Sequence, residues 1–191
     1  MTGRIIATQY ISLDGVIEDP VGMEDSGLGD WTGPYSRGPA GDKFKEDELR
    51  NARAMIFGRR TYDGFSAVWP AVPGDYAERM NTLPKYLASR TIASPEWSNT
   101  VRLGDDLCAS VAELKRMIDG NILIFGSGSV CHQLMRGGLI DEFSLILYPV
   151  VLGCGLRLFP ENTRCSLQLL ENTELKDGLM LLRYGTSPVL E

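Results

Sequence analysis

Two glycine turns in this sequence each follow an apolar run and lead into a segment with helical spacing. They consist of Gly58, Arg59, Arg60 and Thr61, and of Gly126, Ser127, Gly128 and Ser129, followed by Val130. Where a helix begins, free backbone N–H groups and the positive end of the helix dipole bind phosphate, and glycine lets the anion approach the main chain. Arg59 and Arg60 add planar donors that suit a phosphate. Both turns are therefore candidate phosphate sites.

A third candidate anion site is the pair Ser89 and Arg90, which ends another predicted strand. Three such sites at strand ends fit the phosphates of a dinucleotide. Each turn alone is also compatible with a tight strand-to-helix connection that binds nothing. The second turn lacks the third glycine of the G-x-G-x-x-G fingerprint, and Asp141 and Glu142 follow it too early to hold a ribose. Together the three sites favour a dinucleotide cofactor, without the Rossmann fingerprint.

The composition argues against several other kinds of chemistry. His132 is the only histidine, which leaves too few ligands for a zinc site and no base for a Ser-His or Cys-His pair. A hydrolase built on Ser127 or Ser129 is disfavoured, because neither serine stands in G-x-S-x-G. The four cysteines form no C-x-x-C pair and are expected to be free thiols. No metal site is predicted.

Charge and length indicate a small soluble protein. A net charge of -6 without a run of Lys or Arg argues against nucleic-acid and membrane-surface binding. No stretch approaches the roughly 20 apolar residues of a membrane helix, and the N-terminus has no signal-peptide pattern. A hydrophobic fraction of 43% in 191 residues fits one domain over residues 1–191. We expect a cytoplasmic protein.

Strands and helices alternate along the first two thirds of the chain. Runs rich in apolar and β-branched residues predict strands at 4–11, 54–58, 85–89, 100–103 and 122–125. Helical spacing predicts helices at 42–52, 59–65 and 107–118, and another that follows the second glycine turn and ends at Gly137 and Gly138. The alternation predicts an α/β fold in which helices cover both faces of a mostly parallel sheet.

The last third of the chain and one long connection follow different patterns. Residues 139–152 form a long β-rich stretch, and residues 167–175 and 179–184 flank Asp177-Gly178, a pair that favours a tight turn. The chain is therefore expected to end in an antiparallel hairpin. Segment 21–41 is crowded with Gly, Pro, Ser and Asp and is expected to be either a functional lid or a surface excursion.

Four segments in this order resemble a known family. They read SLDGVIEDP, GRRTYDGF, SRT and ILIFGSGSVCHQLMRGGLIDEFSLILYPVVLGCGLRLF. Together they resemble the reductase domain of bacterial riboflavin biosynthesis and its free-standing relatives, over nearly the whole chain from residue 4 to residue 184. The resemblance implies the dihydrofolate-reductase-like fold, which has three layers around a mixed, mostly parallel sheet.

The resemblance also implies NADPH as the cofactor and a role for each motif. Gly58, Arg59, Arg60 and Thr61 would meet the cofactor phosphates, and Gly126, Ser127, Gly128, Ser129 and Val130 would cradle the pyrophosphate. Ser89 and Arg90 would lie near the adenosine 2′-phosphate, which implies NADPH rather than NADH. Ile17 would cover the nicotinamide ring.

Two departures from related enzymes bear on the substrate. The chain lacks the H-x-E and P-C-x-x-C signature of the zinc deaminase domain that often precedes this reductase, so it cannot deaminate. Dihydrofolate reductases place one carboxylate on the first helix to protonate the pterin, and here Asp42, Asp47 and Glu48 compete for that place. Reduction of a C=N or ribosylamine carbon in a heterocyclic substrate is the first hypothesis. A dihydrofolate or other pteridine reductase and a non-catalytic NADPH-binding module are the alternatives.

Reduction of a C=N carbon also needs an acid that protonates the nitrogen. Asp14 ends the first predicted strand at the expected cofactor face and is the first candidate, while aspartate also suits such turns through local hydrogen bonds. Glu48 is the second candidate, and a solvated helix carboxylate is the alternative interpretation. Four aromatic residues could stack on a flat ring or simply pack against the core, and they are left unassigned: Trp31, Tyr35, Tyr62 and Trp69.

An exposed apolar strand invites uncontrolled association unless something covers it. The terminal hairpin and segment 143–152 are apolar and could pair two subunits across their edges. We therefore expect a homodimer.

Overall fold

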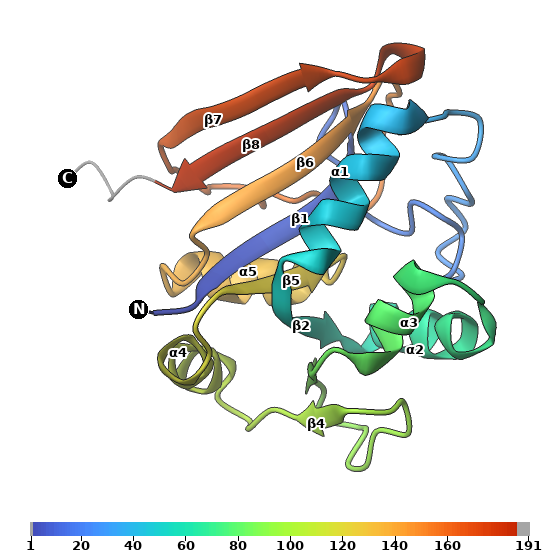
Figure 1. Cartoon of the computed structure of the whole chain (residues 1–191). Helices are drawn as coiled ribbons and strands as arrows, with labels where there is room; N and C mark the ends of the chain where they lie inside the picture. Colours follow the sequence, from blue (N-terminus) through green and yellow to red (C-terminus); the bar gives the residue numbers. More distant parts are fainter. Residues whose placement is uncertain (1, 187–191) are drawn as a thin grey trace.

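An eight-stranded sheet runs through the computed structural model, which describes residues 2–186 (Figure 1). Its strand order is β4-β3-β2-β5-β1-β6-β8-β7. The strands are β1 (Arg4–Ser12), β2 (Ala52–Gly58), β3 (Lys85–Ala88), β4 (Thr100–Arg102), β5 (Asn121–Phe125), β6 (Glu142–Tyr148), β7 (Leu167–Glu174) and β8 (Met180–Thr186). The first six strands are parallel to one another, whereas β8 and β7 add an antiparallel pair at one edge. The predicted mixed sheet with a terminal hairpin is confirmed.

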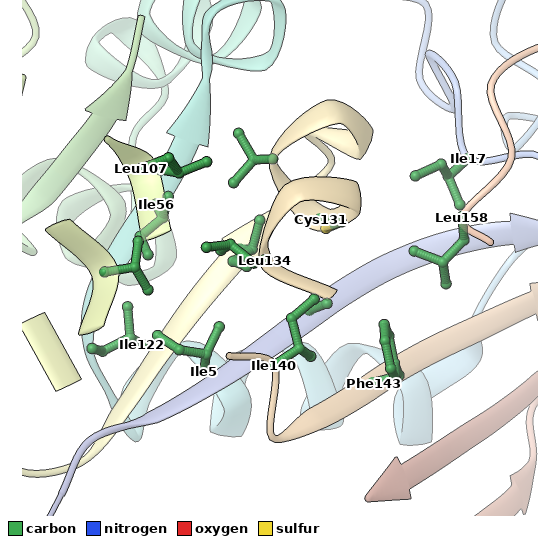
Figure 2. Close-up of a cluster of buried hydrophobic side chains, with 14 of the residues drawn as sticks. Ile5, Ile17, Ile56, Leu107, Ile122, Cys131, Leu134, Ile140, Phe143 and Leu158 are labelled. Atoms are coloured by element: carbon green, nitrogen blue, oxygen red, sulfur yellow. The ribbon is translucent and has the colours of Figure 1, made fainter. Parts of the chain in front are cut away.

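Helices cover both faces of this sheet. They are α1 (Gly38–Arg50), α2 (Arg59–Val68), α3 (Asp75–Thr82), α4 (Leu107–Met117) and α5 (Gly128–Arg136), with short 3-10 turns η1 (Trp69–Ala71) and η2 (Lys176–Gly178). Successive side chains of a strand point to opposite faces. Ile6 of β1 packs in one core cluster with Leu49 of α1 and Met80 of α3. Its neighbour Ile5 packs in another with Leu134 of α5, so the two helix groups lie on opposite faces (Figure 2).

The largest differences from the sequence predictions concern three elements. Helix α1 begins at Gly38, before the predicted residue 42, because Pro39 is tolerated in a first helical turn. Helix α3 was not predicted, since it has only eight residues and follows a proline-rich connection. Strand β6 is shorter than the predicted 139–152 stretch, and it lies between β1 and β8. The prediction that this segment offers a free edge to a second subunit is therefore wrong.

The connection between β1 and α1 is held together by its own polar groups. The buried carboxylate of Asp19 accepts hydrogen bonds from the backbone N–H of Glu24 at 2.8 Å and from the Ser26 hydroxyl at 2.9 Å. The indole of Trp31 donates to the carbonyl of Glu18 at 2.9 Å. These bonds give the segment a defined shape beside the sheet, while its action as a lid stays a prediction.

Asp141 and Glu142, which end the sequence motif LIDE at residues 139–142, lie at the amino-terminal edge of the sheet and connect neighbouring elements. Asp141 accepts the backbone N–H of Ile5 at 2.7 Å and the ammonium of Lys115 at 2.6 Å. Glu142 is buried and pairs with Arg4 at 2.9 Å and with Arg183 at 2.7 Å. This part of the motif is therefore structural. Among residues 2–186 there is no helix of the length and apolar character that crossing a membrane requires.

Candidate active site

The predicted cofactor residues come together because four parallel strands end at the same edge of the sheet. In the order β3, β2, β5 and β1, these strands are neighbours. Their carboxyl ends carry, in turn, Ser89 with Arg90, the Gly58 turn, the Gly126 turn, and the Asp14 turn. Open parallel sheets bind ligands outside the carboxyl ends of their strands. The residues predicted from four distant segments therefore line one edge.

The two glycine turns are bonded to each other through Ser127. Its hydroxyl accepts the backbone N–H of Gly58 at 2.7 Å, and its own N–H donates to the Thr61 hydroxyl at 3.1 Å. Gly126 has a φ of 50°, and a Cβ there would lie 2.9 Å from the Thr61 hydroxyl oxygen. A side chain at Gly126 would thus meet both backbone strain and a close contact. The two turns form one joined surface.

The start of α5 fits an anionic group. Ser127 adopts a left-handed conformation before the helix. Within residues 2–186 the N–H groups of Gly128 and Ser129 have no hydrogen-bond acceptor, as is usual for the first turn of a helix. These donors and the helix dipole suit the pyrophosphate of a dinucleotide. A Cβ on Gly128 would lie 2.5 Å from the Leu156 side chain. Glycine at this position therefore leaves a narrow path open to the start of α5.

The predicted arginines surround this edge with exposed positive charge. The Arg59 and Arg60 side chains are 57% and 73% exposed. In the part of the chain that the structure describes, each has only a long ion pair, Arg59 with Asp63 at 3.4 Å and Arg60 with Glu18 at 3.3 Å. Surface pairs of this kind are weak. A phosphate could therefore recruit either guanidinium with little loss of existing contacts.

The backbone around the carboxyl edge of the sheet is shaped by three further predicted residues: Ser89, Val130 and Ile17. The Ser89 hydroxyl accepts the N–H groups of Thr91 at 3.2 Å and Ile92 at 3.0 Å, which fixes the turn that presents Arg90. Val130 is buried and lies against Gly58, where a Cβ would meet it at 3.3 Å. Ile17 is also buried and approaches Gly128 at the start of α5, beside Leu158 (Figure 2).

A cavity of about 500 Å³ opens beside the joined glycine turns. Thr61 and Gly126 belong to both the turns and the cavity wall. Five aromatic side chains line it: Tyr10, Phe65, Trp69, Tyr76 and Phe125. Charged residues also line it, from the connection before α1 and from α1 itself: Asp19, Glu24, Arg37, Asp42, Lys45 and Glu46. The volume and the aromatic walls suit a small planar ligand.

The candidate acid Glu48 does not line this cavity. Its side chain is 7% exposed and forms an ion pair with Lys45. One carboxylate oxygen also accepts the Thr8 hydroxyl at 2.9 Å, and the other accepts the Ser144 hydroxyl at 2.8 Å. These contacts hold the Glu48 carboxylate behind the residues that line the cavity. The role of Glu48 as an acid stays a prediction. Its position favours another role, in which Glu48 supports Lys45.

The candidate acid Asp14 lies in the turn after β1 and also outside the cavity wall. It accepts the Ser12 hydroxyl at 2.7 Å and the backbone N–H groups of Leu152 at 3.1 Å and Gly153 at 2.9 Å. These hydrogen bonds lower the pKa of Asp14 to about 2. A carboxylate that is ionised at neutral pH is a poor proton donor. The geometry therefore favours the turn-forming interpretation, and the catalytic role of Asp14 stays a prediction.

Glu24 is a cavity carboxylate that sequence reasoning did not single out. It accepts the Thr61 hydroxyl at 2.7 Å. Burial, with support from the charges of Asp19 and Glu18, raises the pKa of Glu24. This carboxylate lies in segment 21–41, where no periodic pattern distinguished it from other loop residues. Its contact with Thr61 nevertheless places it at the boundary between the cavity and the glycine turns.

The aromatic residues left unassigned divide between the cavity and the core. Trp69 lines the cavity. Trp31 and Tyr35 instead pack edge-on against Tyr148 at ring-centre distances of 5.5 and 5.8 Å. The Tyr62 hydroxyl accepts the backbone N–H of Trp97 at 2.9 Å, which makes Tyr62 a core residue.

The sheet order, its helical cover on two faces and its carboxyl-edge cavity define an α/β protein with the dihydrofolate-reductase-like fold. The chain belongs to the RibD C-terminal domain family, whose model matches residues 4–181. The resemblance seen in the motifs is confirmed. This family is reductase-like, and RibD-like reductases depend in general on pyridine nucleotides.

Individual relatives are similar over nearly the whole chain. The uncharacterised proteins YyaP and YwjB of Bacillus subtilis (strain 168) are 26% and 28% identical. The alignments cover 95% of this chain and 94% of YyaP, and 91% of this chain and 92% of YwjB. A crystal structure from Shewanella sp. PV-4, provisionally assigned as a riboflavin biosynthesis protein, has a TM-score of 0.76 at 21% identity. The match covers 98% of this chain and 100% of the Shewanella chain, and it supports the fold assignment.

Proposed function

We propose that this protein is an NADPH-dependent reductase of the riboflavin-biosynthesis type. The reaction would resemble that of a 5-amino-6-(5-phosphoribosylamino)uracil reductase, with hydride transfer to a C=N or ribosylamine carbon of a heterocyclic substrate. The observation that carries the proposal is that Thr61 and Gly126 belong both to the joined glycine turns and to the aromatic-walled cavity. A cofactor held by the turns would thus meet a substrate in the cavity.

The chain's own residues would bind and orient the two reactants. Gly128, Ser129 and the two arginines of the first turn would hold the pyrophosphate, through the free N–H groups and exposed guanidinium groups described above. Bound NADPH would supply the hydride. The aromatic walls would exclude water and keep a planar substrate parallel to them, because reacting atoms must be held close and aligned.

The preference for NADPH over NADH rests on Ser89 and Arg90. Arg90 follows the carboxyl end of β3, two strands from the second glycine turn. Among the described residues it has no ion pair or side-chain hydrogen bond. An exposed guanidinium two strands away from the proposed pyrophosphate site suits a 2′-phosphate, since arginine binds phosphate with two donors.

Fluorescence titration with NADPH and NADH tests the proposal. Arg59→Ala and Arg60→Ala are expected to weaken binding of both nucleotides about tenfold, the cost of roughly one charged hydrogen bond. Arg90→Ala is expected to weaken NADPH alone and so to remove the preference. Arg50→Ala is the matched control, because Arg50 also pairs with an aspartate of its own helix but lies just before β2 begins. Absence of binding by either nucleotide would contradict the proposal.

We also propose that the protein is a homodimer that associates through the edge strand β7. Leu169 and Leu170 of β7 are about half exposed, at 48% and 47%. Unlike β6, this strand has a free edge in the described chain. Sedimentation equilibrium would show a dimer, and replacing both leucines by lysine is expected to give a monomer.

A further inference from the structure

Lys45 is a buried cation in the wall of the cavity. Only 6% of the residue is exposed, yet it is one of the residues that line the space. Lysine is rarely buried to this degree unless it is paired. The pairing partner is Glu48, three residues further along α1. The charge is therefore maintained inside the protein at the position where a ligand would lie.

The surroundings of Lys45 leave one of its three donors unused. One N–H is given to Glu48 and another to the Thr8 hydroxyl at 2.8 Å. Within residues 2–186 no acceptor is present for the third. The ammonium also lies 5.2 Å from the ring centre of Phe125 and 5.8 Å from that of Tyr10, two walls of the cavity. The free donor is therefore framed by aromatic surfaces.

The other cation of the cavity is already engaged. Arg37 donates to the Tyr10 hydroxyl and pairs with Asp42 at 3.0 Å. Burial alone would lower the pKa of Lys45, but the Glu48 carboxylate, with smaller contributions from Tyr10 and Tyr76, more than offsets this and raises the pKa above its usual value. Arg37 also keeps N–H groups that these contacts do not use, but its side chain is 30% exposed, whereas that of Lys45 is 8% exposed. The unused donor of Lys45 is therefore the better shielded of the two.

We propose that Lys45 recognises the substrate, and that the substrate is a planar ring that directs a carbonyl or anionic oxygen at its ammonium. The aromatic walls select the flat ring, and the free N–H selects an acceptor atom, because an unpaired buried donor gains most from a charged hydrogen bond. A ring that presents a cationic face would meet repulsion from Lys45. This inference rests on the proposed function, since it names the kind of substrate that the reductase takes.

Two small planar rings of opposite character test the inference. Orotate carries a carboxylate and ring carbonyl oxygens, whereas protonated 2,4-diaminopyrimidine presents a cationic donor face. Isothermal titration at mildly acidic pH is expected to show binding of orotate and weaker binding of diaminopyrimidine. Lys45→Met is expected to weaken orotate about tenfold or more, the effect of losing one charged hydrogen bond. Lys43→Met is the matched control, because Lys43 is on the same helix and its side chain is 72% exposed.

A second variant covers the case in which Lys45→Met does not fold with Glu48 left unpaired. The double variant Lys45→Met/Glu48→Leu removes both charges and is expected to fold and to show the same loss of orotate binding. If wild-type protein binds diaminopyrimidine as well as orotate, or if both Lys45 variants keep orotate affinity, the inference is wrong. NADPH titration of the same samples judges the proposed function separately, because Lys45 is not part of the glycine turns.

Discussion

Two buried lysines lie in different regions of this molecule and are held in different ways. Lys45 on α1 pairs with the Glu48 carboxylate beside the cavity. Lys85 at the start of β3 is fully buried, and it donates to the backbone carbonyls of Asn81 at 2.8 Å and Leu83 at 2.9 Å. Both ammonium groups lie near an aromatic ring, with 4.5 Å between Lys85 and the ring centre of Trp97. The acceptors differ, and of the two lysines Lys45 alone lines the cavity.

The difference shows that burial alone does not define the role of a charged side chain. The carboxylate partner raises the pKa of Lys45, whereas burial lowers the pKa of Lys85 to about 8. Lys85 caps the end of α3 with two of its three donors, both given to backbone carbonyls, and it does not line the cavity. Lys45 also gives two of its donors to the protein, but it lines the cavity. One lysine is therefore structural, and the other is available to a ligand.

The largest expected effect comes from removing the Glu48 carboxylate, which is the partner of Lys45. Glu48→Gln leaves Lys45 as a buried charge without its partner, which costs about 3 to 5 kcal/mol of unfolding free energy. Urea denaturation at pH 7 measures this loss. Asp47→Asn is the control on the same helix, because Asp47 forms surface pairs with Lys43 and Arg50 and its loss should cost less than about 1 kcal/mol. Equal costs for the two variants would show that the Lys45 charge needs no partner.

Lys85 is expected to give a smaller effect that depends on pH. Its folded pKa lies below its unfolded value, so between about pH 8 and pH 10 the unfolded chain binds more protons at this position than the folded chain. Wild-type stability should therefore rise through this window relative to Lys85→Met, by about 3 kcal/mol at most. Urea denaturation at pH 7, 8.5 and 10 provides the test. A constant difference across the series would mean that Lys85 has an ordinary pKa.

Asp14 sharpens the comparison with the smallest effect, since its carboxylate is held mainly by the Ser12 hydroxyl and two backbone N–H groups, with the Arg157 guanidinium 3.9 Å away. Its lowered pKa means that its contribution to stability is present above pH 4 and is lost as the pH falls toward 2. Asp14→Asn should therefore be less stable than wild type at pH 7, and the difference should shrink at pH 2.5. Asp105→Asn, an exposed surface pair with Arg102, should show no such trend. A pH-independent difference would assign Asp14 a purely steric role.

Most of the fold could be predicted from local patterns because each strand carries its own signal. The β-branched run at 4–11, the apolar run at 122–125 and the Asp177-Gly178 turn each match an observed element. Helix α3 gave no comparable signal, because a segment of eight residues contains too few turns to show periodicity. The start of α1 was missed for a related reason, since glycines and Pro39 at that point resemble a loop.

The site could be predicted only in part, because its parts depend on strand order. The two glycine turns were recognisable from sequence, whereas their junction through Ser127 follows from the adjacency of β2 and β5. Lys45 did carry one signal. It lies on the buried face of α1 with Gly41 and Leu49, at helical spacing, where an apolar residue is the usual choice. Its partner Thr8, and Ser144, which donates to the Glu48 carboxylate, come from distant strands and could not be identified without the structure.

The position of β1 in the middle of the sheet has a consequence for how the chain is made. Within residues 2–186 this strand pairs only with β5 and β6, and the partners of Ile5 and Ala7 include Ile122 and Phe143 from the second half of the chain. Pairing between segments that are distant in sequence is slow, because a long loop must close first. Strand β1 is thus synthesised before either of the strands with which it pairs. Its apolar residues must be kept from other chains until the second half has been synthesised.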